Sequence, residues 1–240
     1  MSEMRRVRTG VPGLDDLVGG GIIEGNTVLV SGTTGTGKTI LGLQFLYSGA
    51  SAYNEPGVLA TLETRPDELR SIAAQFGWDL CSIEKQGKLA IVDAASSRAG
   101  LPTSEKYALR RGFDVPTFIE EIYRAIEECK AKRLVIDSLS GLIRSGDPVE
   151  LRSEMFRIGA LMNQLKVTSL VLGETNGECQ SRAGVEQFVS QGLITLCLTE
   201  NNGCLERSLV VWKMRHTSHS MKRHHFEIGE HGIRVTTGDE

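Results

Sequence analysis

The stretch from Gly32 to Thr39 constrains this chain more than any other part of its sequence. It reads GTTGTGKT and matches the pattern G-x-x-x-x-G-K-[ST] at every fixed position. An apolar run over Thr27–Ser31 precedes it and a helical pattern over Ile40–Tyr47 comes after it. Because the motif requires this strand–loop–helix context, the sequence predicts a phosphate-binding loop at a strand-to-helix turn.

Each residue type in this loop has a physical reason. Glycines allow the backbone to turn its N–H groups toward a phosphate, and the following helix directs its positive N-terminal end at the same group. We expect Lys38 to neutralise the β- and γ-phosphates of ATP and the Thr39 hydroxyl to ligate Mg²⁺. The expected nucleotide contacts are Gly32, Thr33, Thr34, Gly35, Thr36, Gly37, Lys38, Thr39 and Ile40.

Two carboxylates follow other apolar runs of the chain. Asp137 ends the run that begins at Leu134, and Glu63 ends the run that begins at Leu59. Ligands of open α/β sheets bind at the carboxyl ends of strands, so we expect Asp137 to hold the water shell of Mg²⁺. Glu63 has two interpretations that spacing does not separate. It is a base that polarises the attacking water, or a charge that stabilises a helix beginning near Pro66.

The order of apolar runs predicts the fold class. Nearly continuous apolar runs, typical of strands buried on both faces, alternate with helical patterns up to Gln191. The expected strands in this part are Thr27–Ser31, Gly57–Leu62, Lys88–Val92, Arg133–Asp137 and Ser169–Leu172. The expected class is therefore α/β, a P-loop NTPase with a mostly parallel central sheet flanked by helices.

Beyond Gln191 the strands are joined by short turns such as Asn201-Asn202-Gly203, which predicts a C-terminal antiparallel extension of the sheet. Its expected strands are Leu193–Leu198, Ser208–Trp212, His225–Ile228 and Gly232–Val235. Helices are expected over 69–76, over 115–126 with Asp114 as the N-cap, and over 151–165. The polar stretch Ala94–Arg111 predicts a loop, and the absence of a linker predicts one domain over residues 1–240.

Charge and cysteine usage exclude several classes of function. The formal net charge is −3, so the chain lacks the basic field that holds nucleic acid. The five cysteines are scattered and never form a C-x-x-C pair, which favours reduced thiols in the cytoplasm. The N-terminus is polar and basic, and no apolar run reaches the length of a membrane span. We therefore expect a cytoplasmic protein without a membrane partner.

The C-terminal part of the sequence holds all five histidines and a small group of cations. A zinc site there is disfavoured, because no cysteine or carboxylate stands at ligand spacing and His224 and His225 would point to opposite faces of a strand. Lys213 and Arg215 alternate by two, which places them on one face of a strand. They form either a solvated surface or an anion site.

Together these motifs resemble the KaiC family of RecA-type ATPases. The resemblance covers roughly residues 7–235 and rests on the conjunction of several segments. These are Thr9–Asp16, Ser31–Thr39, Gln44–Tyr47, Phe76–Leu80, Ile136–Ser138, Gly184–Ser190, Lys213–His219 and His231–Ile233. The resemblance implies a RecA-like fold, with this chain as a single-domain relative. It also implies a homo-oligomer, a hexameric ring with ATP between its subunits.

The same resemblance implies roles for further residues. Glu63 matches the first of a pair of family glutamates and would be the catalytic base, whereas Thr64 stands in the second position. Gln75 matches another nucleotide contact, and His216 replaces a glycine. Lys213 and Arg215 would supply catalytic cations to the neighbouring subunit. The residues that would reach the neighbour's nucleotide are Lys213, Met214, Arg215, Thr217 and His219.

Three functions compete at this point. The first is an ATP-hydrolysing ring whose nucleotide state controls the binding of a regulatory protein partner. The second is a recombinase paralogue that binds DNA, and the third is a nucleotide-binding scaffold without turnover. The loop expected over Gly173–Ser190 favours the first over the second, because Glu174, Glu178 and Glu186 outnumber the single cation Arg182 and would repel phosphates.

Overall fold

The computed structural model describes residues 4–109, 112–138, 156, 159–160, 162–175 and 190–236. Most of the helix expected over 151–165 lies outside these residues. Most of the Gly173–Ser190 loop, including the segment Gly184–Ser190 except for Ser190 itself, lies outside them as well.

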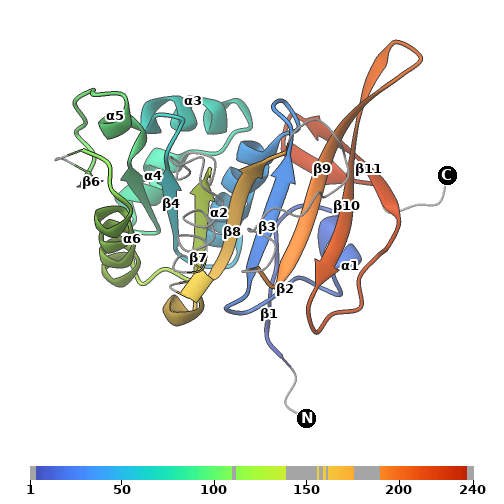
Figure 1. Ribbon diagram of the computed structural model, residues 1–240, viewed down its shortest axis with the longest axis horizontal. Coiled ribbons are helices and arrows are strands. Elements are labelled where there is room, and N and C mark those ends of the chain that lie inside the picture. Colours follow the sequence, from blue (N-terminus) through green and yellow to red (C-terminus); the bar gives the residue numbers. More distant parts are fainter. Residues whose placement is uncertain are drawn as a thin grey trace.

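The described residues form one large sheet and a small two-stranded one (Figure 1). The small sheet pairs β1 (Arg6–Val7) with β2 (Ile22–Ile23). The strands of the large sheet are β3 (Thr27–Gly32), β4 (Gly57–Thr61), β5 (Leu89–Asp93), β6 (Tyr107–Ala108), β7 (Arg133–Asp137), β8 (Thr168–Glu174), β9 (Gly192–Asn201), β10 (Cys204–Met214), β11 (Arg223–Gly229) and β12 (Gly232–Val235).

The order of the large sheet is β12-β11-β10-β9-β3-β8-β7-β4-β5-β6. From β9 to β6 every neighbouring pair is parallel, and from β9 to β12 every pair is antiparallel. The predicted mostly parallel sheet with a C-terminal antiparallel extension is therefore confirmed. Among the described residues no helix has both the length and the apolar character needed to cross a membrane.

The helices cover both faces of this sheet. The helices whose bounds the structure describes are α1 (Leu14–Leu17), α2 (Lys38–Ala52), α3 (Pro66–Gln75), α4 (Leu80–Lys85), α5 (Ala95–Arg98) and α6 (Val115–Cys129), and residues 159–160 and 162–165 are helical as well. Consecutive residues of β3 belong to different cores. Val28 and Val30 pack in the cluster that includes α2, whereas Leu29 packs in the cluster that includes α6. A strand buried on both faces explains why its sequence is continuously apolar.

Local sequence signals position several boundaries as expected. The Asp114 carboxylate accepts a hydrogen bond from the Thr117 N–H at 2.8 Å and so caps α6. Asn202 and Gly203 connect β9 to β10 with φ angles of 51° and 78°, the two positive values that a tight hairpin turn requires. Both the cap and the hairpin predicted from the sequence are confirmed.

The loop predicted over Ala94–Arg111 is wrong for much of its described part, because this segment contains α5 and β6. The buried Asp93 accepts a hydrogen bond from the Ser96 N–H at 2.9 Å and thereby starts α5. Tyr107 and Leu109 are buried in the same core as α6. Both elements are too short to show a hydrophobic period, so periodicity does not reveal them.

One buried amide ties the two ends of the chain to α2. The Gln44 side-chain N–H group donates to the carbonyl oxygens of Gly10 and Ile233 at 3.1 and 3.0 Å. The Gln44 carbonyl oxygen accepts from the Ile233 N–H at 2.7 Å. The N-terminal segment and β12 are therefore held against the helix that begins after the phosphate-binding loop.

The buried side chain of Arg133 packs against α2. Arg133 is fully buried, and its guanidinium pairs with the Glu55 carboxylate at 2.6 Å and donates to the Phe45 carbonyl at 2.8 Å. The guanidinium also lies 4.5 Å from the centre of the Phe45 ring. Gly49 of α2 makes room for this side chain, because a Cβ atom there would lie 2.4 Å from Arg133 Cδ.

We expect Gly49→Ala to lower the free energy of unfolding by about 1–3 kcal/mol. Alanine favours a helix over glycine by about 1 kcal/mol, but Arg133 cannot move aside without weakening its ion pair and its carbonyl contact. Urea unfolding followed by circular dichroism measures the effect. Gly229→Ala is the matched control, since nothing lies within 4 Å of the added Cβ. A Gly49→Ala protein as stable as the wild type would contradict this packing.

Candidate nucleotide-binding site

A cavity of about 440 Å³ opens at the carboxyl ends of β3, β4, β7 and β8, beside the N-terminus of α2. Open α/β folds bind ligands at the carboxyl ends of their strands. The residues expected from the sequence that line it are Thr34, Gly35, Gly37, Lys38, Thr39, Ile40, Glu63, Gln75 and Asp137. The structure therefore brings together the residues predicted from the phosphate-binding loop and from two other strand ends.

The loop between β3 and α2 has a backbone that depends on glycine. Gly35 and Gly37 have φ angles of 82° and 99°, and Gly37 is the N-cap of α2. Inside the loop, the buried Thr36 hydroxyl donates to the Thr33 carbonyl at 2.8 Å. Gly32, Thr33 and Thr36 shape the loop without lining the cavity. The shape of the loop thus comes from positive φ angles and internal hydrogen bonds.

Lys38 is the buried cation of the cavity. Its ammonium donates to the carbonyl oxygens of Gly32 and Thr33 at 2.8 and 2.9 Å. Burial lowers the pKa of Lys38, and the negative charges of Glu174, Asp137 and Glu63 oppose that shift. An ammonium has three N–H donors, so one remains that can meet a phosphate oxygen.

Thr39 and Asp137 form a pair of oxygen donors beside Lys38. The Thr39 hydroxyl donates to Asp137 Oδ2 at 2.7 Å. Burial raises the pKa of Asp137, whereas the hydrogen bond from Thr39 lowers it. A hydroxyl and a carboxylate are hard oxygen ligands of the kind that Mg²⁺ prefers, so the two residues fit this ion.

Glu63 lines the cavity and is not part of α3, which begins at Pro66. Its Oε1 atom accepts a hydrogen bond from the Ser138 hydroxyl at 2.7 Å. The acidic residues in the first turn of α3 are Asp67 and Glu68. The position of Glu63 therefore favours a role in the cavity over the alternative of a charge at a helix N-terminus.

Two charged residues of the cavity were not predicted as site residues. Glu174 ends β8, and its Oε1 accepts a hydrogen bond from the Thr34 hydroxyl at 3.4 Å. The sequence groups it with the acidic loop, although the strand-end rule that selects Asp137 also selects Glu174. Arg207 of β10 donates to the Gly35 carbonyl at 3.4 Å. No local sequence signal marks Arg207, since its approach depends on how far the β9–β10 hairpin extends past the loop.

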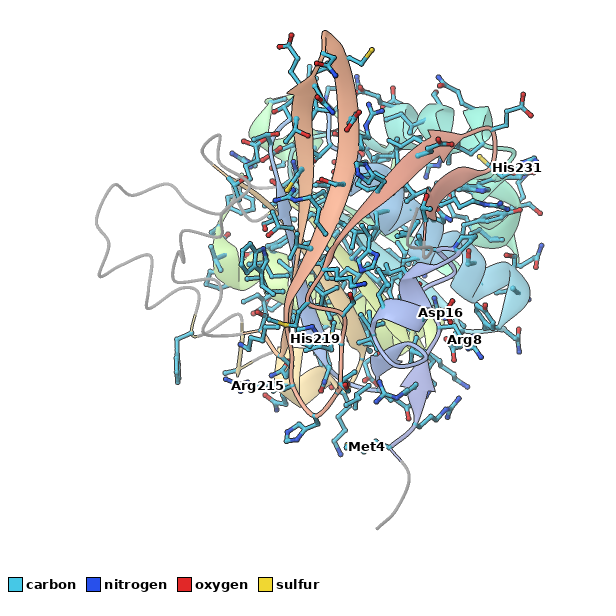
Figure 2. The ribbon with its side chains drawn as sticks, turned by 90° about the vertical axis from the view of Figure 1, so that its right-hand side faces the viewer. Met4, Arg8, Asp16, Arg215, His219 and His231 are labelled. Carbon is cyan, nitrogen blue, oxygen red and sulfur yellow. The ribbon has the colours of Figure 1, made fainter. Side chains whose placement is uncertain are left out.

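By the family resemblance, Lys213–His219 would reach the nucleotide of a neighbouring subunit. In the structure this segment lies near the amino-terminal end of β3, opposite the end at which the cavity opens. Met214 pairs with Gly192, which pairs with Val28 at the start of β3, whereas Gly32 at its end pairs with Leu196. These two levels are separated by roughly 13 Å along the strand. Figure 1 shows β3 and β10 pointing in opposite directions, and Figure 2 shows Arg215 and His219 near the end of β10. Among the described residues that line the cavity, none belongs to Lys213–His219.

The prediction that Lys213 and Arg215 share one face of a strand is wrong, because β10 ends at Met214. A register shift separates Val211 from Lys213, and Lys213 donates to the Ser190 carbonyl at 2.6 Å. The two cations are nevertheless close. Burial lowers the pKa of Lys213, and the charge of Arg215 lowers it further. His216 comes next with a φ of 58°, a left-handed conformation that glycine adopts more readily than other residues.

The histidines of this region do not gather into a metal site. Over the residues that the structure describes, no group of three or more histidine, cysteine, aspartate or glutamate side chains is arranged to hold a metal ion. The His224 ring instead shares a hydrogen bond of 2.6 Å with the Ser220 hydroxyl.

Comparisons with family models, sequences and solved structures all indicate the same family. The family model described as "ATPase: KaiC" matches residues 7–240. UPF0273 proteins of Thermotoga maritima and Methanocaldococcus jannaschii are each 43% identical over 235 residues, which cover 97% of this chain and 96% of theirs. The circadian clock oscillator protein KaiC of Synechococcus elongatus is 37% identical over 233 residues, which cover 96% of this chain and 44% of KaiC.

A solved structure agrees with these sequence matches. The crystal structure of a KaiC-like protein from Pyrococcus horikoshii OT3 superimposes with a TM-score of 0.84 at 41% identity, covering 98% of this chain and all of that one. The sheet order and the loop between β3 and α2 define a RecA-like P-loop ATPase domain. Within that class, the chain belongs to the KaiC family.

Proposed function

We propose that this protein binds ATP with Mg²⁺ in the cavity between β3 and α2 and hydrolyses it slowly. The convergence of Lys38, Thr39, Asp137 and Glu63 at one edge of the sheet carries this proposal. A buried ammonium, a pair of oxygen donors and a carboxylate beside a glycine-rich loop are the parts that phosphoryl transfer to water requires.

Each of these residues has a separate task in the proposed reaction. Lys38 and the N-terminus of α2 stabilise charge on the phosphates. Thr39 would ligate Mg²⁺ and Asp137 would hold its water shell, and the ion would supply positive charge to the phosphates. Glu63 polarises the attacking water and accepts its proton, while Ser138 orients the carboxylate through Oε1. Thr64 supplies a hydroxyl where a second carboxylate would stand, which is why we expect slow turnover.

The charges of the cavity support assembly into a homo-oligomeric ring. Among the residues that the structure describes, its lining carries three carboxylates, Glu63, Asp137 and Glu174, against the two cations Lys38 and Arg207. A polyanionic nucleotide adds further negative charge, so the transition state needs cations from outside this set. Lys213 and Arg215 lie at the opposite end of the sheet, where they cannot reach the cavity of their own chain. In the proposed hexamer they complete the site of the next subunit.

The alternatives differ from this proposal in the step after nucleotide binding. The loop that would contact DNA in a recombinase lies almost entirely outside the described residues, and its acidic sequence disfavours phosphate contacts. A scaffold without turnover does not require a carboxylate in the position of Glu63. We therefore propose that hydrolysis sets the lifetime of an ATP-bound state which a regulatory protein partner recognises.

We expect Glu63→Gln to slow ATP hydrolysis by about 10²- to 10⁴-fold while leaving ATP affinity nearly unchanged. Glutamine keeps the shape of the side chain and accepts from Ser138, but it cannot take a proton from water. Phosphate release measures hydrolysis, and calorimetric titration with Mg–ATP measures affinity. Glu68→Gln removes the same charge from the first turn of α3 and is the control. Equal hydrolysis by wild type and Glu63→Gln would remove Glu63 from the mechanism.

We also expect activity to return when two inactive variants are mixed. Arg215→Ala removes the cation offered to the neighbour, and Lys38→Ala removes the phosphate contact inside the cavity. Arg215→Ala should lose about 10³- to 10⁵-fold in rate, as for a missing arginine finger, and Lys38→Ala should be inactive because it no longer binds ATP. Mixed rings contain interfaces in which an intact cavity meets an intact Arg215.

The measurement is ATP hydrolysis by the mixture after co-assembly has been verified by pull-down of differently tagged subunits. Partial recovery supports a site shared between subunits. A co-assembled mixture that remains inactive, or an Arg215→Ala protein with wild-type activity, would contradict the assignment of Arg215.

A further inference from the structure

The loop that carries Glu63 is fixed by contacts from two different elements. On the side of β7, the Leu62 N–H donates to the Asp137 carbonyl at 2.7 Å, and Ser138 holds the Glu63 carboxylate. On the side of α5, Arg98 Nη1 donates to the Leu62 carbonyl at 3.0 Å. The proposed reaction uses the contacts from β7 and leaves Arg98 without a role.

The Arg98 contact acts directly on the backbone of Glu63. The Leu62 carbonyl and the Glu63 N–H belong to one rigid peptide plane. A hydrogen bond that fixes the orientation of this carbonyl therefore limits rotation of the plane from which the Glu63 side chain extends. Leu62 itself is buried, and the Asp137 contact holds the preceding Thr61–Leu62 peptide, so the peptide planes on both sides of the Leu62 Cα are held.

Arg98 is itself held in a defined place. The fully buried Asp93 caps the first turn of α5 through the Ser96 N–H, and the Ala94 N–H donates to the Thr61 carbonyl at 3.0 Å. The Arg98 guanidinium lies 5.5 Å from the centre of the Phe113 ring, a cation–π distance. These contacts attach α5 to β4 and β5, so the guanidinium reaches Leu62 from a fixed direction.

We propose that Arg98 is a positioning residue for Glu63, which keeps the carboxylate aimed into the cavity through the Leu62–Glu63 peptide. The inference rests on the proposed function, because it takes Glu63 as the group that polarises water. Glu63 itself is exposed, and a misplacement of about 1 Å in a reacting group is enough to slow catalysis about 10²-fold. A contact outside the cavity that orders this loop therefore affects turnover rather than nucleotide affinity.

The test is Arg98→Met, which removes the N–H donors but keeps an apolar stem against Phe113. We expect kcat for ATP hydrolysis to fall about tenfold, the effect of losing one hydrogen bond from a charged donor, with Kd for Mg–ATP unchanged within about twofold. Arg65→Met is the matched control. It removes the same charge from the connection between β4 and α3, where Arg65 makes an exposed ion pair with Asp67 at 3.5 Å. Arg98→Leu, which also lacks a side-chain N–H donor, serves as the second variant if the methionine protein does not fold.

A double-mutant cycle with Glu63→Gln distinguishes positioning from general stabilisation. If Arg98 acts through Glu63, the Arg98 change should have no further effect on kcat once Glu63 is glutamine. Three results would overturn the inference: an additive loss of kcat in the double variant, a rise in Kd of Arg98→Met as large as its loss of kcat, or an unchanged kcat in Arg98→Met. The proposed function fails separately, if Glu63→Gln alone hydrolyses ATP at the wild-type rate.

Discussion

The pairing of β3 with two parallel neighbours holds the phosphate-binding loop, and the rest of the site is arranged around that loop. β3 is in register with β8 and β9 up to Gly32, and its side chains enter a core on each face of the sheet. The loop therefore starts from a strand that cannot shift without breaking both ladders and both cores. Parallel strands end at the same edge, so Glu63, Asp137 and Glu174 are presented around Lys38 by the same constraint.

The sequence predicted the parts of this arrangement that carry a repeating or fixed pattern. Strands buried on both faces are nearly continuously apolar, so β7 was located to the residue and the other parallel strands of the predicted set to within two residues at each end. The phosphate-binding loop has fixed positions. Elements such as α5 and β6 were missed because a buried carboxylate and a few packed side chains define them, and neither has a period. Arg207 could not be predicted, since its place beside Gly35 results from the extension of a hairpin far along the chain. Arg215 lies beyond the end of β10, after a register shift between Val211 and Lys213 that no local sequence signal predicts.

The two ends of the sheet carry opposite chemistry, and this polarity gives the proposed oligomer its physical basis. One end holds a cavity whose described residues include more carboxylates than cations, and the other holds Lys213 and Arg215. Contacts between unlike surfaces of identical subunits produce rings when the rotation closes. A nucleotide between such surfaces supplies the negative charge that draws the cationic end toward the cavity. In the proposed ring, ATP is both the substrate and part of the subunit interface, and the proposed role of Arg98 is to order the loop that carries Glu63.

In the ring that we propose, the hydrolytic site is complete only between two copies of the chain. The most direct test is the rate of Mg–ATP hydrolysis per subunit across a dilution series, with the oligomeric state at each concentration measured by analytical ultracentrifugation. We predict that the rate per subunit falls as the oligomers dissociate and becomes negligible for monomers. A rate per subunit that stays constant through complete dissociation would show that one chain hydrolyses ATP alone, and would contradict the claim.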